Sequence, residues 1–258
     1  MPPAYHTLLA VWGLYMFALT MSILLRRVED DQRVHDLPLG LDNHAIPKSL
    51  AWKLMTLPAI PSVLVFYAMA GGFQTHNLMS PQAVFIGLYC LHYLYRSLIY
   101  PQRLRTSRQR YSPVLVVLTW TYYIPMGYFM GTYFAQNDPI IAQLSLPVML
   151  IGGLLFFSGL VSTILHDEWL IRLRHTPSQD YAIPTRGLFQ YTSNAHYFSE
   201  FVEWTGFALM TMALPAFVHQ VAVFALMLPQ AIKTHTWYRN HFGTRYPTNR
   251  TSFFPFLF

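Results

Sequence analysis

Seven long apolar stretches dominate the chain, and each approaches the length of about 20 residues that a helix needs to cross a bilayer. The stretches are Thr7–Leu25, Leu50–Ala70, Ala83–Tyr100, Pro113–Phe134, Ile140–Leu165, Tyr197–Met212 and Pro215–Ile232. A bilayer offers the backbone no water to pair with, so such segments form helices. The sequence therefore predicts an all-α, polytopic membrane protein with seven transmembrane helices. We expect residues 1–258 to form one domain, with the cofactor site mostly in residues 166–258.

The turn between the last two stretches is very short. Only Ala213 and Leu214 separate them, and Pro215 follows. Proline favours the first turn of a helix, where its missing N–H costs nothing. The sequence predicts a tight helical hairpin at this point.

The composition excludes several other classes of protein. Charged residues make up only 11% of the chain, against roughly 25% in soluble domains. Cys90 is the only cysteine, so neither an internal disulfide nor a Cys-rich metal site is possible. The 11 histidines lack the clustered spacing of a metal site, and no GxGxxG, P-loop or GxSxG stretch occurs. We expect no metal and no soluble Rossmann-type cofactor site.

The basic residues predict the topology. All 17 Lys and Arg fall in four blocks, Arg26–Lys53, Arg96–Arg110, Arg172–Arg186 and Lys233–Arg250, and none lies in the intervening loops. Basic loops are usually cytoplasmic. We therefore expect an outside N-terminus, a cytoplasmic C-terminus and no nucleic-acid partner. The expected location is a bacterial inner membrane, with the active site opening to the cytoplasm.

Carboxylates near the start of the sixth stretch are candidates for function. Glu200 and Glu203 are three residues apart and share a helix face. Acidic groups at membrane depth are costly and mark functional sites by default, although interfacial pairing with Arg or His would also explain them. Asn194 and His196 precede them, and ordinary capping by Ser193 or Asn194 is the alternative interpretation there.

Other polar groups are ambiguous from position alone. Asp167 and Arg174 follow the fifth stretch, where charges commonly only mark topology. Arg105 and Arg110 belong to a basic cluster that suits either phosphates or anionic lipid headgroups. Tyr93 lies near a membrane interface, where tyrosines concentrate for amphipathic reasons.

Two C-terminal segments carry specific motifs. Ile183–Thr211 contains GLF-x-Y followed by E-x-x-E-W, and His235–Phe258 contains WY, YP, an arginine and a terminal PF-x-F. Weaker similarity extends over Leu50–Pro58 and Gly87–Ser97. With these segments the chain resembles the steroid 5α-reductase family, the 3-oxo-5α-steroid 4-dehydrogenases, over most of its length.

The resemblance implies NADPH-dependent reduction of the C4–C5 double bond of 3-oxo-Δ4 steroids. Relatives that reduce polyprenols or enoyl-CoA thioesters keep those substrates open as alternatives. The residues that match family cofactor contacts are Asp167, Arg174, Tyr181, Glu200, Trp204 and Tyr238. To these we add Asn194, His196, Arg105 and Arg110 as predicted cofactor ligands.

The resemblance also implies the catalytic and substrate residues. Tyr93 resembles the family tyrosine that faces the steroid 3-keto oxygen, and Trp52 resembles a pocket tryptophan. Met55 and Thr56 stand where the human steroid enzymes carry Gln-Glu, whose glutamate pairs with the catalytic tyrosine. We expect Thr56 to act beside Tyr93 in catalysis, and Trp52, Met55 and Tyr93 to contact the substrate.

The chain departs from the family pattern at four further positions. His196 stands at a family asparagine, while Ala182 and Gln230 stand at family arginines. Arg186 has no family counterpart. These changes bear on the steroid geometry more than on cofactor binding.

Two alternative functions, a methyltransferase and a lipid carrier, belong to other functional classes than a reductase. A membrane methyltransferase of the isoprenylcysteine type would use S-adenosylmethionine, and a lipid carrier would need no cofactor. The segments around Trp52 and Tyr93 favour a reductase, and the absence of polar residues in mid-helix argues against a transport path. The expected partners are an apolar lipid or steroid substrate and membrane lipids, with no obligate protein partner.

Overall fold

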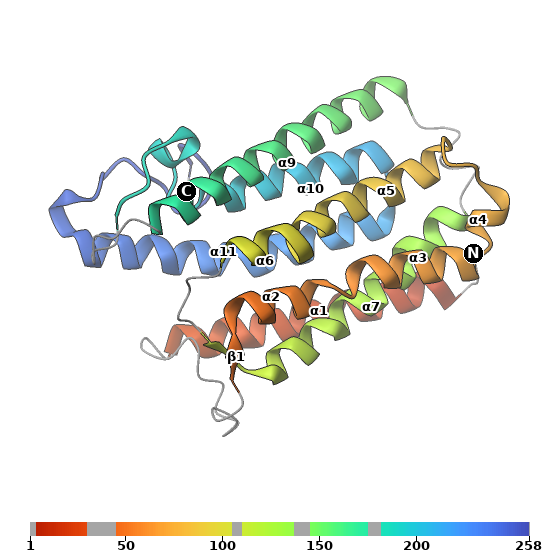
Figure 1. Cartoon of the computed structure of the whole chain (residues 1–258), viewed down its shortest axis with the longest axis horizontal. Helices are drawn as coiled ribbons and strands as arrows, with labels where there is room; N and C mark the ends of the chain where they lie inside the picture. Colours follow the sequence, from red (N-terminus) through yellow and green to blue (C-terminus); the bar gives the residue numbers. More distant parts are fainter. Residues whose placement is uncertain (1–3, 30–44, 105–109, 137–144, 175–181, 258) are drawn as a thin grey trace. The chain divides into compact units, whose positions relative to one another are not determined.

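The computed structural model describes residues 4–29, 45–104, 110–136, 145–174 and 182–257 (Figure 1). For residues 17–29 and for Arg174 it describes the backbone alone. The chain divides into two compact units, Met1–Leu144 and Ser145–Phe258.

The first unit is a set of packed helices. They are α1 (Ala4–Glu29), α2 (Lys48–Thr56), α3 (Ala59–Met69), α4 (Gly72–Thr75), α5 (Pro81–Leu94), a π-helical turn (Tyr95–Ile99), α6 (Tyr100–Arg103) and α7 (Pro113–Gln136). A short antiparallel pair, β1 (Ile46–Pro47) with β2 (Arg110–Tyr111), joins the starts of α2 and α7. Helix α3 packs along α7, where a Cβ on Gly131 would lie 2.7 Å from the backbone nitrogen of Tyr67.

In residues 145–174 and 182–257, the second unit contains three long helices and two short 3₁₀ turns. They are α9 (Leu146–Arg174), a turn at Gly187–Gln190, α10 (Ala195–Thr211), α11 (Leu214–Phe242) and a turn at Gly243–Arg245. Helices α9 and α10 approach closely, because a Cβ on Gly159 would lie 2.4 Å from the backbone nitrogen of Glu203. Small residues at such an interface are typical of helices that associate within membranes.

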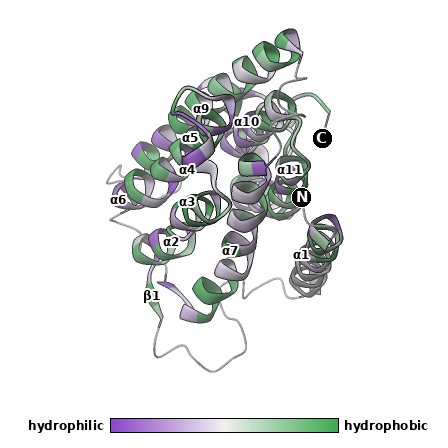
Figure 2. Cartoon of the chain, turned by 90° about the vertical axis from the view of Figure 1, so that its right-hand side faces the viewer, coloured by the Kyte–Doolittle hydropathy of each residue, from purple (hydrophilic) through white to green (hydrophobic). Residues whose placement is uncertain are grey.

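Among the described residues, four helical segments are long and apolar enough to cross a membrane. They are Lys48–Met69, Pro113–Gln136, Leu146–Leu173 and Leu214–Arg245. Figure 2 shows hydrophobic residues along the helices. The prediction of a helical, integral membrane protein is confirmed, but the predicted number of seven spans is not.

The other three predicted spans are not among these four segments. The first lies in α1, whose side chains beyond Met16 are outside the described part. The third is divided among α5, the π-helical turn and α6. The sixth lies in α10, which has 17 residues and is shorter than the about 20 that a span needs.

The turn between α10 and α11 has the predicted form. Helix α10 ends at Thr211, Met212 takes a φ of 47°, and α11 begins at Leu214 with a proline in its first turn. Helix α11 is longer than predicted, because it continues past Ile232 until Gly243, whose φ is 53°. His235 and Tyr238 therefore lie on a helix rather than in a polar tail.

Candidate functional site

Three buried carboxylates mark the pair of helices α9 and α10. Asp167 on α9 is 2% exposed, and Glu200 and Glu203 on α10 are 9% and 0% exposed. Removing a carboxylate from water costs free energy unless it is paired or hydrogen-bonded. Ionisable groups buried at membrane depth are functional candidates by default, so these three carboxylates mark a candidate site.

Hydrogen bonds connect the same two helices. The Oγ atoms of Ser162 on α9 and Ser199 on α10 lie 2.8 Å apart, and His166 Nδ1 lies 3.2 Å from Ser199 Oγ. On its other side, His166 Nε2 accepts a hydrogen bond of 3.2 Å from the backbone N–H of Leu188. His166 thus ties the loop before α10 to the polar end of α9.

Asn194 fixes the start of α10. Its buried Nδ2 donates to the carbonyl oxygens of Ala231 (3.0 Å) and Ser252 (2.8 Å), and Oδ1 is buried with no hydrogen-bond partner in the described part of the chain. One interpretation of the sequence was that Ser193 or Asn194 caps α10. The side chain of Asn194 makes no capping hydrogen bond to α10. Only Oδ1 of Asn194 remains available to a ligand.

A polar cluster joins α11 to the C-terminal segment. Ser193 Oγ lies 2.6 Å from His235 Nδ1 and 2.5 Å from the hydroxyl of Tyr246, and it donates to the carbonyl oxygen of Thr251 at 3.1 Å. The ring of Tyr238 stacks on Tyr246, with centroids 5.5 Å apart. The predicted ligand Tyr238 therefore lies beside this cluster.

Arg250 is a candidate that the sequence analysis did not single out. Its guanidinium lies 5.4 Å from the ring of Tyr246, and its buried Nε and Nη1 have no hydrogen-bond partner among the described residues. Buried guanidinium donors without acceptors are costly, and an anionic or carbonyl ligand would satisfy them. The sequence signal was the isolated arginine after the YP pair of the C-terminal motif.

Two other predicted cofactor ligands have different surroundings. Trp204 is fully buried, with its ring 4.2 Å from His219 and 5.6 Å from Phe207. It therefore lies in the packing between α10 and α11. His196 is partly exposed and its ring lies 4.1 Å from that of Tyr197.

Tyr93 lies in an aromatic cluster of the first unit. It is buried on α5, with its ring 4.7 Å from Tyr89 and 5.3 Å from Tyr123 on α7. The π-helical turn Tyr95–Ile99 begins two residues later. Such turns occur frequently at functional sites. The phenol is thus held by aromatic packing beside an irregular turn.

Trp52 on α2 belongs to a second cluster in this unit. Its ring lies 5.6 Å from Tyr100, and the guanidinium of buried Arg96 lies 5.9 Å from Trp52 and 5.2 Å from Tyr100. The indole Nε1 is buried with no partner in the described residues. A cation over aromatic faces stabilises this arrangement, so Trp52 is held with an unused donor.

The residues that replace the family Gln-Glu pair have separate roles. Thr56 Oγ1 donates to the carbonyl oxygen of Trp52 at 2.9 Å, which uses its only hydrogen and leaves only acceptor capacity. Met55 packs in a hydrophobic cluster with Ala51 and Val116. The side chain of Met55 therefore contributes to the packing of α2 against α7.

The basic candidates are only partly described. Arg105 and Tyr181 lie outside the described residues, and Arg174 ends α9 with its side chain undescribed. The exposed side chain of Arg110 donates to the carbonyl oxygen of Ala45 through Nε, at 2.9 Å, and through Nη2. Arg110 therefore ties down the chain beside the β1–β2 pair.

Apolar helices with buried polar groups define a helical membrane protein with candidate sites in each unit. A family model described as 3-oxo-5-alpha-steroid 4-dehydrogenase matches residues 109–258. The chain belongs to this family, as its motifs indicated, and is therefore an oxidoreductase that acts on CH–CH bonds with a nicotinamide cofactor.

Similar proteins cover most of the chain. The 3-oxo-5-alpha-steroid 4-dehydrogenase 1 of Bos taurus is 32% identical over 215 residues, or 82% of each chain. The protein of the same name from Rattus norvegicus is 32% identical over 213 residues, 82% of this chain and 81% of its own. The steroid 5-alpha-reductase DET2 of Gossypium hirsutum is 30% identical over 250 residues, 95% of each chain. These matches favour the reductase over the methyltransferase and the lipid carrier.

Proposed function

We propose that this protein reduces the C4–C5 double bond of 3-oxo-Δ4 steroids with NADPH. The observation that carries the proposal is the burial of Asp167, Glu200 and Glu203 on α9 and α10, within the part of the chain that the family model matches. The names of the relatives supply the substrate class, because they are 3-oxo-5-alpha-steroid 4-dehydrogenases and steroid 5-alpha-reductases.

The polar residues of the second unit fit a nicotinamide cofactor. When bound, NADPH supplies the hydride. Glu200 accepts hydrogen bonds from ribose hydroxyls or from the carboxamide, and Asn194 Oδ1 offers a further acceptor that no described group uses. Arg250 offers two buried donors to a phosphate or carbonyl oxygen. Arg105, Arg174 and Tyr181 remain further predicted ligands.

Tyr93 is the proposed electrophilic group. Reduction of an enone places a hydride on the β carbon, so negative charge builds on the carbonyl oxygen. A hydrogen-bond donor about 2.7–3.1 Å from that oxygen stabilises the charge. The phenol of Tyr93 donates this bond, and Trp52 lines the steroid pocket. Thr56 offers Tyr93 only an acceptor, because its own hydrogen is donated to Trp52.

We also propose that the active site opens to the cytoplasm of a bacterial cell. The support is the distribution of Lys and Arg over four blocks of one set of loops. A reporter enzyme that is active only in the cytoplasm, fused after Phe258, tests this orientation. Activity of the fusion is expected, and an inactive but expressed fusion contradicts it.

The first experiment uses purified protein in detergent with NADPH and progesterone. We expect a product two hydrogens heavier by chromatography and mass spectrometry, and little product with NADH as the control. Saturable NADPH binding without product would reject the steroid and direct the search to polyprenols and enoyl-CoA. No NADPH binding would reject NADPH as the cofactor.

A further inference from the structure

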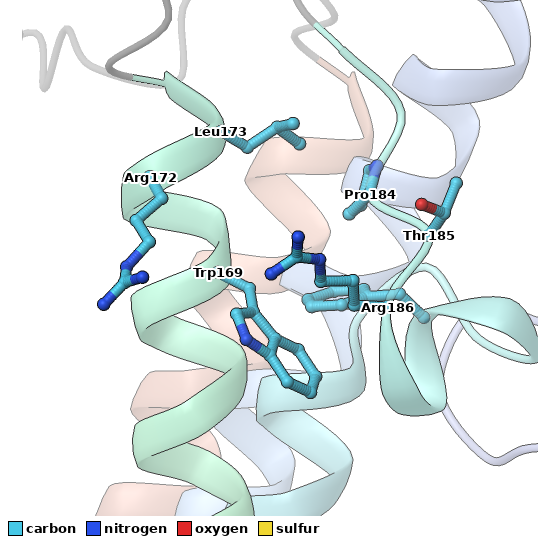
Figure 3. A pocket seen from close by; sticks show the side chains of 7 residues that line it. Trp169, Arg172, Leu173, Pro184, Thr185 and Arg186 are labelled. Carbon is cyan, nitrogen blue, oxygen red and sulfur yellow. The ribbon is translucent and has the colours of Figure 1, made fainter.

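A cavity opens at the polar end of α9, in the second unit. It has a volume of about 300 Å³ and is lined by Trp169, Arg172, Leu173, Pro184, Thr185, Arg186 and Phe189. One water occupies roughly 30 Å³ in the liquid, so the cavity has room for a group larger than a few waters. Figure 3 shows the side chain of Arg186 extending from the loop toward α9, while Arg172 projects outward from the helix.

The loop that carries Arg186 is anchored immediately after it. Gly187 has a φ of +55°, and a Cβ there would lie 2.6 Å from the ring of Trp169. The N–H of Leu188 donates to His166, and Phe189 is buried in a cluster with Leu170. Three consecutive anchors therefore hold Arg186 at the mouth of the cavity.

The charge at the cavity is positive. The carboxylate of Glu168 pairs with Arg172, with Nε and Oε1 2.8 Å apart. The guanidinium of Arg186 has no ion pair or hydrogen bond with the described residues. Two guanidinium groups and one carboxylate leave one net positive charge, which favours an anionic ligand.

An exposed apolar face of α9 lies on the same helix as Arg172 and ends near it. Leu154, Phe157, Val161 and Leu165 are between 46% and 73% exposed and repeat every three or four residues. Arg172 follows Leu165 by seven residues, which is about two helical turns, so it continues the same face. Val161 lies about 16 Å along the axis from Arg172, close to half of the roughly 30 Å hydrocarbon core.

This arrangement matches one kind of molecule. A membrane phospholipid places an acyl chain along an apolar surface and a phosphate at its polar end. Trp169 belongs to the residue type that concentrates at that interface. We propose that the cavity binds the phosphate of an anionic phospholipid through Arg186, with an acyl chain along the exposed face of α9. The site is independent of the reaction proposed above.

The test measures lipid selection in phosphatidylcholine vesicles that contain the purified full chain. Spin-labelled phosphatidylglycerol and phosphatidylcholine report, by electron paramagnetic resonance, which lipid is retained at the protein. We expect the chain to prefer phosphatidylglycerol by about fivefold, as one basic residue near a membrane surface typically provides. Arg186→Gln should abolish most of this preference, whereas Arg186→Lys should retain it.

Matched controls separate the site from general surface charge. Arg239 is an exposed arginine of α11 that does not line the cavity, so Arg239→Gln should leave the preference unchanged. Glu168→Gln removes the competing carboxylate and should increase the preference. The proposal would be overturned if Arg186→Gln and Arg239→Gln lost the preference for phosphatidylglycerol equally. It would also be overturned if the unaltered chain showed no such preference.

Two further measurements identify the source of the phosphate. Excess inorganic phosphate at constant ionic strength should not displace the labelled lipid, because free phosphate lacks the acyl chain. Displacement would assign the cavity to a soluble anion. The affinity for NADPH should be unchanged in Arg186→Gln. Weaker NADPH binding with normal lipid selection would assign the cavity to the cofactor and overturn the lipid site.

Discussion

The imidazole of His166 connects two segments that are 22 residues apart, because Nε2 accepts a hydrogen bond of 3.2 Å from the backbone N–H of Leu188. Nδ1 lies 2.6 Å from the carbonyl oxygen of Ser162, which can only accept. The two bonds together require a neutral ring with its hydrogen on Nδ1. The loop between α9 and α10 therefore depends on one tautomer of one histidine.

Replacement of His166 by alanine should lower the thermal stability of the protein. The partly buried N–H of Leu188 loses its acceptor, and because a fully buried unsatisfied donor costs about 1–3 kcal/mol, we expect a loss of about 1 kcal/mol, or roughly 2–4 °C in Tm. Thermal unfolding in detergent measures the change. His166→Gln retains a side-chain acceptor and should lose less. Equal losses in the two variants would show that the ring packs but does not anchor the loop.

Gly187→Ala tests the close contact between the loop and α9. The new Cβ would lie 2.6 Å from the ring of Trp169 and 2.9 Å from Nε2 of His166, in a backbone conformation with φ of +55°. Gly71→Ala is the matched control, because Gly71 lies in the left-handed α region with a φ of +87° and has no neighbour within 4 Å.

Both variants carry the backbone penalty of about 1–2 kcal/mol, but only Gly187→Ala adds the steric clash. We expect the lower Tm for Gly187→Ala, together with a shifted tryptophan emission from Trp169. Identical Tm values would mean that the contact with Trp169 and His166 relaxes without cost.

The contact between α9 and α10 at Gly159 positions the backbone of Glu203. A Cβ on Gly159 would lie 2.4 Å from the nitrogen of Glu203, whereas one on Gly153 meets only the sulfur of Met210 at 3.8 Å. Gly159→Ala should therefore separate the helices and reduce both stability and turnover. Gly153→Ala should be neutral or slightly stabilising, by up to about 1 kcal/mol, because alanine is the better helix former. Similar Tm and kcat values for the two variants would contradict this packing.

The sequence predicts the helices well where an apolar run is long and ends at a turn residue. Pro113–Phe134 and the hairpin before Pro215 follow from composition and local chemistry. The polar residues after Ile232 predict a loop there, but α11 continues to Phe242. No proline or glycine interrupts the chain between Ile232 and Gly243, so the helix continues.

Contacts between distant segments leave no periodic pattern in the sequence. The bonds from Asn194 to Ala231 and Ser252 and the burial of Arg250 depend on how α10, α11 and the C-terminal segment meet. The sequence predicts that Asn194 lies near a helix start, but it does not predict the hydrogen bonds that its Nδ2 donates to α11 and to the C-terminal segment. Family motifs gave the candidate residues, and the structure shows which of their atoms are already used.

Tyr93→Phe tests the proposed electrophilic group. The change removes the hydroxyl and keeps the ring that packs against Tyr89 and Tyr123. Loss of one donor to a developing oxyanion typically lowers kcat by about 10²–10³-fold. We expect this loss in steroid reduction, with NADPH affinity unchanged. Near-normal turnover would show that another group polarises the ketone.

Tyr123→Phe is the matched control for Tyr93→Phe, because it removes a hydroxyl from the ring that packs against Tyr93. We expect the smaller loss of turnover for Tyr123→Phe. A larger loss there than in Tyr93→Phe would move the proposed donor to Tyr123.

Glu200→Gln tests the acidic site on α10. The amide is nearly the same size as the carboxylate but removes the charge, so a hydrogen bond to a charged group is lost, worth about 1.5–3 kcal/mol. NADPH should bind about tenfold more weakly or worse, as measured by titration of the purified protein. Glu168→Gln is the matched control, because Glu168 pairs with Arg172 at the polar end of α9 and should not affect NADPH. Equal affinities in Glu200→Gln and the unaltered chain would remove Glu200 from the cofactor site, while weaker binding in both variants would point to a general effect of negative charge.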